Sequence, residues 1–343
     1  MSRLFVNAMN VHQGGGAVLL CDLLRAIPLD VEATVHVDAR MNVPTDLPDH
    51  VCVKRVEPTL SGRFAAERRL VDTVAPHDQV LCFGNLPPIF RLRSKVVVFL
   101  QNRYLIDPCA PLGALPIKPR IRTWLERAWL RGLRLNASQY IVQTPSMQTL
   151  ATQHLGVPTS CEPFAPVSIL SQTDVPIEQR FDFIYVASGE GHKNHRKLLE
   201  AWCLLAEEGL HPSLVVTLDT FDTPDLLSII EEAKIRYQLR ITNLGIVDHQ
   251  TILQIYSMCD ALIYPSSFES FGLPLTEAKN AGLAILAPEL DYVRDIIDPD
   301  QTFDAMSSLS ISRAVKRYLL KDNRPKLEIL NATQFLHKLL GKT

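Results

Sequence analysis

The sequence has no apolar run approaching the roughly 18–20 residues of a membrane-spanning helix, and it has no low-complexity tract. Its first residues lack the apolar stretch and the small-residue cleavage site of a secretory signal. Of its 343 residues, 47% are hydrophobic and 21% are charged, which excludes a disordered or fibrous protein. We therefore expect a globular protein of the cytoplasm, and the length favours two domains over one.

Cysteine patterns that would build a disulfide framework or a zinc site are also missing. The seven cysteines are scattered, odd in number and without a CxxC pair, which is typical of reduced thiols in the cytosol. The formal net charge is −2, so the composition indicates no general affinity for nucleic acid.

Short apolar runs alternate with segments of helical periodicity along the chain. The runs predict buried strands at residues 4–6, 33–37, 79–83, 95–100, 139–142, 181–187, 214–218, 241–244, 261–264 and 284–287. The predicted helices include residues 17–25, 195–208, 224–237, 250–259 and 274–281. Strands separated by helices are typical of parallel sheets, so the predicted fold class is α/β.

A proline-containing stretch, residues 161–166, interrupts the pattern and predicts a connector. We expect residues 1–163 to form one Rossmann-like domain and residues 167–343 a second. Two such domains in tandem leave a cleft between the carboxyl ends of their sheets, where ligands bind.

Residues 264–282 contain most of the candidate functional groups. There a predicted strand leads into a loop, and a helix begins near Gly272 and Pro274. The backbone N–H groups of Phe271, Gly272 and Leu273 would be unpaired donors at the positive end of that helix. The segment therefore predicts an anion site.

Two glutamates flank this anion site. Glu269 lies in the loop, and Glu277 lies about one turn into the helix. A diphosphate on the N–H groups, with ribose or sugar hydroxyls on the acids, would fit a nucleotide sugar. The alternative is that both acids are solvated charges that the helix dipole favours.

From Pro265 to Ala278 the segment resembles the Glu-x7-Glu signature of the retaining, GT-B-fold glycosyltransferases of family 4, also called glycosyl transferases group 1. The resemblance implies two tandem Rossmann-like domains that face a cleft, the first on the acceptor side and the second binding the nucleotide sugar. It also implies that the last helix, around residues 334–340, returns to the first domain. In this interpretation Glu277 holds the ribose, while Glu269 and Ser270 to Leu273 bind the donor sugar and its diphosphate.

Three further positions follow the family pattern. Residues 183–194 resemble the first strand of the second domain and its phosphate loop, which implies that Lys193 binds the donor diphosphate and acts with Glu269 in catalysis. Val247 would meet the base through its backbone. The glycine-rich turn at Gly15 and Gly16 resembles the loop that closes on the donor from the first domain.

The sequence departs from the family pattern at two places. Where the family has Gly-Arg early in the phosphate loop, this chain has Ala187-Ser188, so one cation for the diphosphate is missing. Where the family often has a histidine after the strand at residues 95–100, this chain has Gln101 and Asn102. An uncharged amide could hold the donor sugar there, and His12 is a less suitable substitute.

Residues 117–135, from Ile117 to Leu135, form a basic stretch that contains two tryptophans. A basic amphipathic helix of this kind can lie in an anionic membrane interface, which would suit an acceptor carried on a polyprenyl lipid at the inner membrane. The alternative is an ordinary helix whose tryptophan face packs in the core.

The resemblance implies a retaining transferase that moves a hexosyl group from a nucleotide-diphosphate sugar to a hydroxyl of a glycan or lipid-linked acceptor, as in O-antigen or capsule synthesis. No cofactor and no metal is implied, and Asp298-Pro-Asp300, a formal Asp-x-Asp match, is predicted to be a turn. Two alternatives stay open. One is a sugar-nucleotide-binding accessory protein that has lost catalysis, and the other is a GT-B-fold nucleotide-sugar epimerase.

Overall fold

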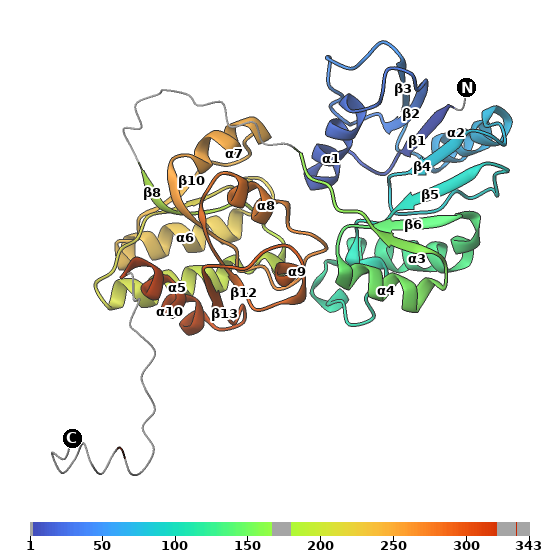
Figure 1. Ribbon diagram of the computed structural model, residues 1–343. Helices are drawn as coiled ribbons and strands as arrows, with labels where there is room; N and C mark the ends of the chain where they lie inside the picture. Colours follow the sequence, from blue (N-terminus) through green and yellow to red (C-terminus); the bar gives the residue numbers. More distant parts are fainter. Residues whose placement is uncertain (1–2, 167–179, 321–333, 335–343) are drawn as a thin grey trace.

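The chain folds into two α/β domains that lie side by side, as Figure 1 shows for the computed structural model. The structure describes residues 3–166, 180–320 and Gln334. The predicted last helix, around residues 334–340, therefore lies outside the described residues except for Gln334. The boundary between residues 163 and 167 stays a prediction.

The N-terminal domain is built on a seven-stranded sheet with the order β3-β2-β1-β4-β5-β6-β7. Its strands are β1 (Leu4–Ala8), β2 (Ala33–Asp38), β3 (Val51–Val56), β4 (Gln79–Cys82), β5 (Lys95–Phe99), β6 (Gln139–Val142) and β7 (Thr159–Cys161). Its α-helices are α1 (Gly14–Arg25), α2 (Leu60–Thr73), α3 (Ile117–Leu133) and α4 (Pro145–Leu155), with short 3-10 turns at Arg103–Leu105, Leu112–Ala114 and Arg134–Asn136.

The C-terminal domain is built on a six-stranded sheet with the order β10-β9-β8-β11-β12-β13. Its strands are β8 (Phe181–Tyr185), β9 (Leu214–Val216), β10 (Ile241–Asn243), β11 (Cys259–Ile263), β12 (Ala284–Pro288) and β13 (Gln301–Phe303). Its helices are α5 (His195–Glu207), α6 (Pro224–Tyr237), α7 (His249–Tyr256), α8 (Leu273–Asn280), α9 (Asp291–Arg294) and α10 (Ser308–Leu319), and a 3-10 turn spans Gly191–Lys193.

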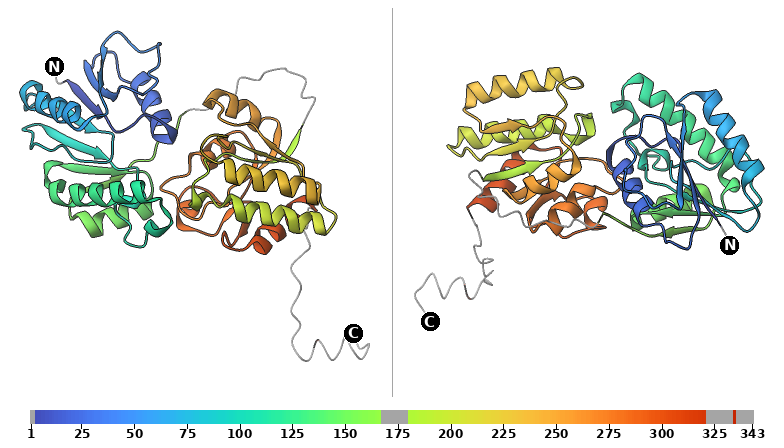
Figure 2. Two further views of the ribbon diagram at one scale, coloured as in Figure 1. Left: turned by 180° about the vertical axis from the view of Figure 1, so that it is seen from behind. Right: turned by 90° about the horizontal axis from the view of Figure 1, so that it is seen from above.

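All paired strands of both sheets run parallel, which confirms the predicted fold class. In each sheet the order reverses beside the first strand, at β1/β4 and at β8/β11. The loops after these strands diverge at such a switch point and leave a crevice for a ligand. Helices cover both faces of the sheets (Figure 2).

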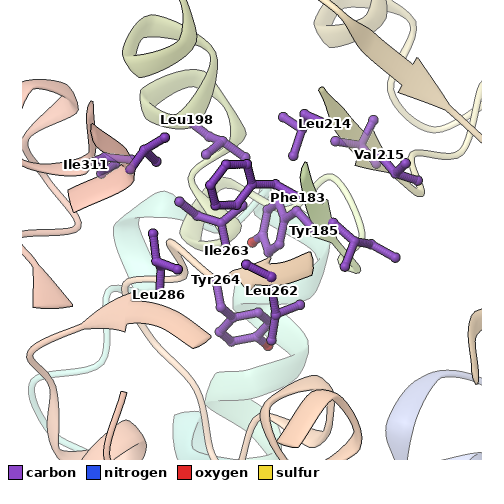
Figure 3. Packing of buried hydrophobic residues seen from close by; sticks show 14 of the residues in the cluster. Phe183, Tyr185, Leu198, Leu214, Val215, Leu262, Ile263, Tyr264, Leu286 and Ile311 are labelled. Atoms are coloured by element: carbon purple, nitrogen blue, oxygen red, sulfur yellow. The ribbon is translucent and has the colours of Figure 1, made fainter. Parts of the chain in front are cut away.

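Each sheet is buried on both faces, which explains why the strands are continuous apolar runs. In β1, Phe5 packs into one cluster of the N-terminal domain and Val6 into the cluster on the other face. The C-terminal domain has one large core, and Figure 3 shows Phe183, Tyr185 and Tyr264 among its side chains. This core fixes the strand ends from which the site loops leave.

The two domains touch through a few specific contacts beside the cleft. Arg103, after β5, donates two hydrogen bonds to the Asp291 carboxylate, at 2.9 Å from Nη1 and 2.8 Å from Nη2. Its backbone N–H donates to Ser270 Oγ at 2.8 Å. In addition, Leu273 packs against the core of the N-terminal domain. The start of α8 is therefore held against both domains.

Some sequence-based boundaries were wrong. The predicted helix at 250–259 ends at Tyr256, and Cys259 begins strand β11. Cys161, placed in the connector, belongs to strand β7. Strands β3, β7 and β13 were missed, because β3 carries Lys54 and Arg55 and the other two contain no run of apolar residues.

Candidate active site

A cavity of about 850 Å³, called here the larger cavity, lies between the two domains at the switch points of their sheets. It collects nine of the ten residues that the sequence predicted to bind the donor. They are Gly15, Gly16, Lys193, Val247, Glu269, Ser270, Phe271, Gly272 and Leu273. Glu277 does not line this cavity.

A helix begins where the sequence predicted one, at the start of α8, and the binding of an anion there stays a prediction. Gly272 is the N-cap and has a φ of 80°, a left-handed conformation that favours glycine. Within residues 3–166 and 180–320, nothing accepts a hydrogen bond from the backbone N–H of Phe271, Gly272 or Leu273. These donors line the larger cavity with the positive end of the helix dipole behind them.

A second helix N-terminus points at the same cavity. Helix α1 begins with Gly14, Gly15 and Gly16, all three of which line the cavity, and Gln13 gives it no side-chain cap. A Cβ atom on Gly15 would come within 2.9 Å of Leu273 Cδ1, so the missing side chain allows the two helix starts to approach. Figure 1 shows α1 on the side of the N-terminal domain that faces the C-terminal domain. Two sets of unpaired N–H groups therefore face one space.

Lys193 and Glu269 form an ion pair inside the larger cavity. Lys193 Nζ donates to Glu269 Oε1 at 2.6 Å, and both side chains are nearly buried. Burial opposes ionisation of Glu269, but the charge and hydrogen bond of Lys193 outweigh it and lower the pKa of this carboxyl. The Glu269 carboxyl is therefore ionised at neutral pH.

Two tyrosines that sequence reasoning missed hold this pair in place. The Tyr264 hydroxyl donates to Glu269 Oε1 at 3.0 Å, and the Tyr185 hydroxyl donates to the Lys193 backbone oxygen at 2.6 Å. Both rings are fully buried in the C-terminal core (Figure 3). Both tyrosines stand near the ends of predicted strands beside the motifs, which was the available signal.

Glu277 is buried and already has two partners. His249 Nε2 lies 2.8 Å from its Oε1, and the Tyr256 hydroxyl donates to its Oε2 at 3.3 Å. The hydrogen bond to Glu277 raises the pKa of His249, although burial opposes it. A carboxylate can accept about four hydrogen bonds, so acceptor capacity remains for a diol. No pattern in the sequence linked His249 to Glu277, because they lie 28 residues apart.

The lining of the larger cavity contains more acidic than basic side chains. Val247 is part of it, with Gly245 and Ile246. Lys193 supplies the one Lys or Arg side chain among the described lining residues, against the carboxylates of Glu190, Asp219, Asp222 and Glu269.

Among the described residues that line the larger cavity, no arginine replaces the one that the phosphate loop lacks. Ala187 and Ser188 line the larger cavity where the family pattern has Gly-Arg, and the Ser188 hydroxyl bonds to Glu190. Any charge on a ligand there must be balanced by Lys193 and the helix N-termini. The described residues also include no cluster of three or more His, Cys, Asp and Glu that could hold a metal ion.

The basic stretch forms helix α3, which is only partly packed. Trp129 is half-buried and donates from Nε1 to the Pro87 oxygen at 2.9 Å, but Trp124 is 65% exposed. Ile117, Ile121 and Leu125 are also exposed. The alternative in which the whole tryptophan face packs in the core is therefore wrong for Trp124. Across residues 3–166 and 180–320, no helix has both the length and the hydropathy to cross a bilayer.

Comparison with known proteins agrees with this geometry. Residues 171–334 match the model of the family described as "Glycosyl transferases group 1". The chain is 26% identical to O-antigen chain mannosyltransferase B of Escherichia coli over 135 residues, or 36% of this chain and 34% of that one. It is 24% identical to the serotype-specific mannosyltransferase WbdA of Escherichia coli over 217 residues, or 60% of this chain and 25% of WbdA. The matches thus span about a third or less of these relatives.

Solved structures share the architecture. A crystal structure of Anabaena Alr3699/HepE in complex with UDP and glucose has a TM-score of 0.67 at 16% identity and covers 94% of this chain and 91% of that one. WaaG, a glycosyltransferase involved in lipopolysaccharide biosynthesis, has a TM-score of 0.68 at 18% identity and covers 93% and 90%. The predicted fold, two Rossmann-like domains facing a cleft in the GT-B arrangement, is confirmed.

Proposed function

Since residues 171–334 match the model of the glycosyl transferases group 1, we propose that this chain belongs to that family and is a retaining glycosyltransferase. It moves a hexosyl group from a nucleotide-diphosphate sugar to a hydroxyl of a glycan or lipid-linked saccharide. The names of its relatives, an O-antigen chain mannosyltransferase and a serotype-specific mannosyltransferase, support a role in cell-surface polysaccharide synthesis. We propose that the polysaccharide is of the O-antigen or capsule type and that the chain acts on the cytoplasmic side of the membrane.

The observation that carries this proposal is the convergence of two helix N-termini and Lys193 on one cavity. Breaking the bond to the sugar leaves negative charge on a nucleoside diphosphate, and donors fixed in advance stabilise that charge most effectively. Lys193 has three N–H protons and gives one to Glu269, so the others remain for phosphate oxygens. The N–H groups of α1 and α8 act on the same diphosphate.

Glu269 orients the donor sugar and stabilises positive charge at the anomeric carbon. Burial opposes its ionisation, but Lys193 lowers the pKa of Glu269, so the carboxylate stays ionised. Glu277 binds the ribose diol, and Val247 meets the base. We assign no covalent nucleophile to this site. Closure of the two domains excludes water, which would otherwise hydrolyse the donor.

We also propose that helix α3 contacts an anionic membrane surface. Its exposed apolar side chains stand among Lys118, Arg120 and Arg131, all exposed, so that aliphatic and aromatic groups can enter the interface while the cations meet headgroups. This location suits an acceptor carried on a polyprenyl lipid.

The test is to incubate the purified chain with UDP-, GDP- and ADP-sugars, with and without lipid-linked acceptors. We expect release of nucleoside diphosphate that depends on one donor and on the acceptor, and a product that keeps the anomeric configuration by NMR.

A sugar-nucleotide-binding accessory protein is the second candidate, because Lys193 is the single Lys or Arg among the described residues of the cavity. Such a protein would bind a nucleoside diphosphate and release none.

A further inference from the structure

A second, smaller cavity of about 310 Å³ opens beside the larger one, mainly on the side of the N-terminal domain. The two cavities share Gln13, Gly16, Gln101, Glu269 and Ser270. The walls of the smaller cavity carry an unusual concentration of carboxamide side chains, namely Asn10, Gln13, Asn85, Gln101 and Asn102.

Backbone hydrogen bonds fix three of these carboxamides and define which atom each leaves over. Asn85 Oδ1 accepts from the N–H groups of Gln101 and Asn102, at 2.6 and 2.9 Å. Asn102 Oδ1 accepts from the N–H of Tyr104 at 3.0 Å, and Gln101 Nε2 donates to the Phe83 oxygen at 3.1 Å. An oxygen must face an N–H and a nitrogen must face a carbonyl, so the amide orientations are determined.

The leftover atoms form a set of donors and an acceptor. Asn85 and Asn102 keep their Nδ2 groups, and Gln101 keeps its Oε1; no described residue bonds to these three atoms. Because their partners are backbone atoms next to β4 and β5, the orientations are present before a ligand arrives. Pre-organised groups of this kind bind hydroxyls at little cost in side-chain entropy.

Tyr104 completes the wall with an unsatisfied hydroxyl. Its oxygen is buried and has no hydrogen-bond partner within the described part of the chain. Burial, together with the charges of Glu269 and Glu190, raises the pKa of Tyr104 to about 12, so the hydroxyl remains a donor. Its ring packs on Phe268, with 4.6 Å between ring centroids. A buried polar group without a partner is costly, and a ligand hydroxyl would relieve that cost.

The smaller cavity offers no cation for an acidic ligand. Its described lining includes no Lys or Arg, and its ionisable groups besides Tyr104 are Glu269 and His192. Burial and the charge of Lys193 lower the pKa of His192, so this ring is neutral at pH 7. A carboxylate or phosphate at this position would face the Glu269 carboxylate, while Lys193, the cation paired with Glu269, lines the larger cavity and not this one.

We propose that the smaller cavity binds the acceptor, and that the acceptor unit held there is an uncharged sugar. Its hydroxyls pair with Asn85, Asn102 and Tyr104, beside the Glu269 that both cavities share. The identification of this sugar as the acceptor rests on the proposed function. The binding of an uncharged sugar can be measured without any transfer reaction.

The direct test is saturation-transfer NMR on the full chain with methyl α-D-mannoside, methyl α-D-glucoside and methyl α-D-galactoside, each beside its 6-carboxylate. We expect at least one neutral glycoside to bind and its carboxylate to bind at least ten-fold more weakly. Tyr104→Phe removes only the hydroxyl, and Asn102→Asp keeps the oxygen that accepts from Tyr104 while removing Nδ2. Each should weaken binding about five-fold, the usual scale of one hydrogen bond.

Asn280→Asp, on an exposed residue at the end of α8, is the matched control for the added charge and should change nothing. Binding of none of the neutral glycosides, or equal binding of their carboxylates, would overturn the inference. It would also be overturned if Tyr104→Phe weakened a nucleotide sugar but not the free nucleoside diphosphate, since the cavity would then hold the donor sugar. Failure of UDP, GDP and ADP to bind the wild type, with glycoside binding intact, would instead refute the proposed function.

Discussion

Lys193 Nζ donates a hydrogen bond to Glu269 Oε1 across 2.6 Å, and so joins the loop after β8 to the loop after β11. These residues lie 76 positions apart in the chain, but β8 and β11 are paired neighbours in the sheet. The parallel register brings both loops to the same edge, beside the start of α8. The chemistry that we propose depends on this pairing of a cation with an acid at the mouth of a helix.

Lys193→Ala should lower kcat by about 10²–10³, the typical loss when one fixed donor to a developing negative charge is removed. Removing the cation also leaves Glu269 buried without its ion partner, so the pKa of Glu269 should rise. The measurement is the rate of nucleoside diphosphate release with a saturating donor. Lys197→Ala, which breaks an exposed ion pair with Glu200, is the control and should stay within two-fold of the wild type, on the order of an exposed pair's contribution. Equal rates in both variants would remove Lys193 from the mechanism.

The pair of His249 and Glu277 predicts a pH dependence of stability. The pKa of His249 is raised in the folded state, chiefly by its hydrogen bond to Glu277, and Asp248 and Asp22 add in the same direction. The stabilisation is fully present below the unfolded pKa, roughly 6.5, and is lost as the pH rises through the higher folded value. The thermal unfolding midpoint of the wild type should therefore fall toward that of His249→Gln as the pH rises from 6 to 9. A difference between the two proteins that is constant over this range contradicts the prediction.

Gly15→Val tests the close approach of the two helix starts. A Cβ at this position would lie 2.9 Å from Leu273 Cδ1, and a branched side chain must push α1 and α8 apart. We expect binding of the nucleoside diphosphate to weaken about ten-fold, the effect of roughly 1.4 kcal/mol. Gly132→Val in helix α3 has open space around its Cβ and serves as the control. Calorimetric titration of both variants measures the effect, and unchanged affinity of Gly15→Val would show that the approach is not needed.

Trp124→Ser and a double change of Arg120 and Arg131 to Gln test the membrane proposal. Both should reduce co-sedimentation with vesicles that contain anionic lipid. The first change removes apolar area that would be buried in the membrane interface, and the second weakens the free energy of membrane binding by about 1 kcal/mol for each cation lost. Neutral vesicles should bind the wild type weakly. Absence of wild-type binding to anionic vesicles at low salt would refute the membrane contact. The function proposed for the larger cavity does not depend on that contact.

Local signals predicted much of the fold. Helix α6 was predicted with its observed bounds, Pro224–Tyr237, because proline at the start and a clear apolar period mark it. The strands that were missed lie toward sheet edges, where a short run or exposed charges weaken the apolar signal. Helix α7 was predicted too long because residues up to Cys259 continue its apolar pattern, although β11 takes Cys259 into the sheet.

Local sequence signals likewise predicted one part of the candidate site and missed another. The N–H groups of α8 were predictable, because a helix start is local and glycine marks it. Gly15 and Gly16 were also predicted at the site, but as a turn before the helix, whereas they belong to the first turn of α1. Side-chain partners that lie far apart in the chain, such as His249 for Glu277, depend on how distant elements pack. Their identity is therefore a property of the tertiary structure and has no short-range pattern.

The most direct test of the central claim is a crystal structure of the chain with UDP or GDP bound. The account predicts that the diphosphate lies in the larger cavity within hydrogen-bond distance of Lys193 Nζ and of the backbone N–H groups of Gly272 and Leu273. It places the ribose toward Glu277 and the base toward Val247. A nucleotide bound elsewhere, or with its phosphates pointing away from the start of α8, would contradict it.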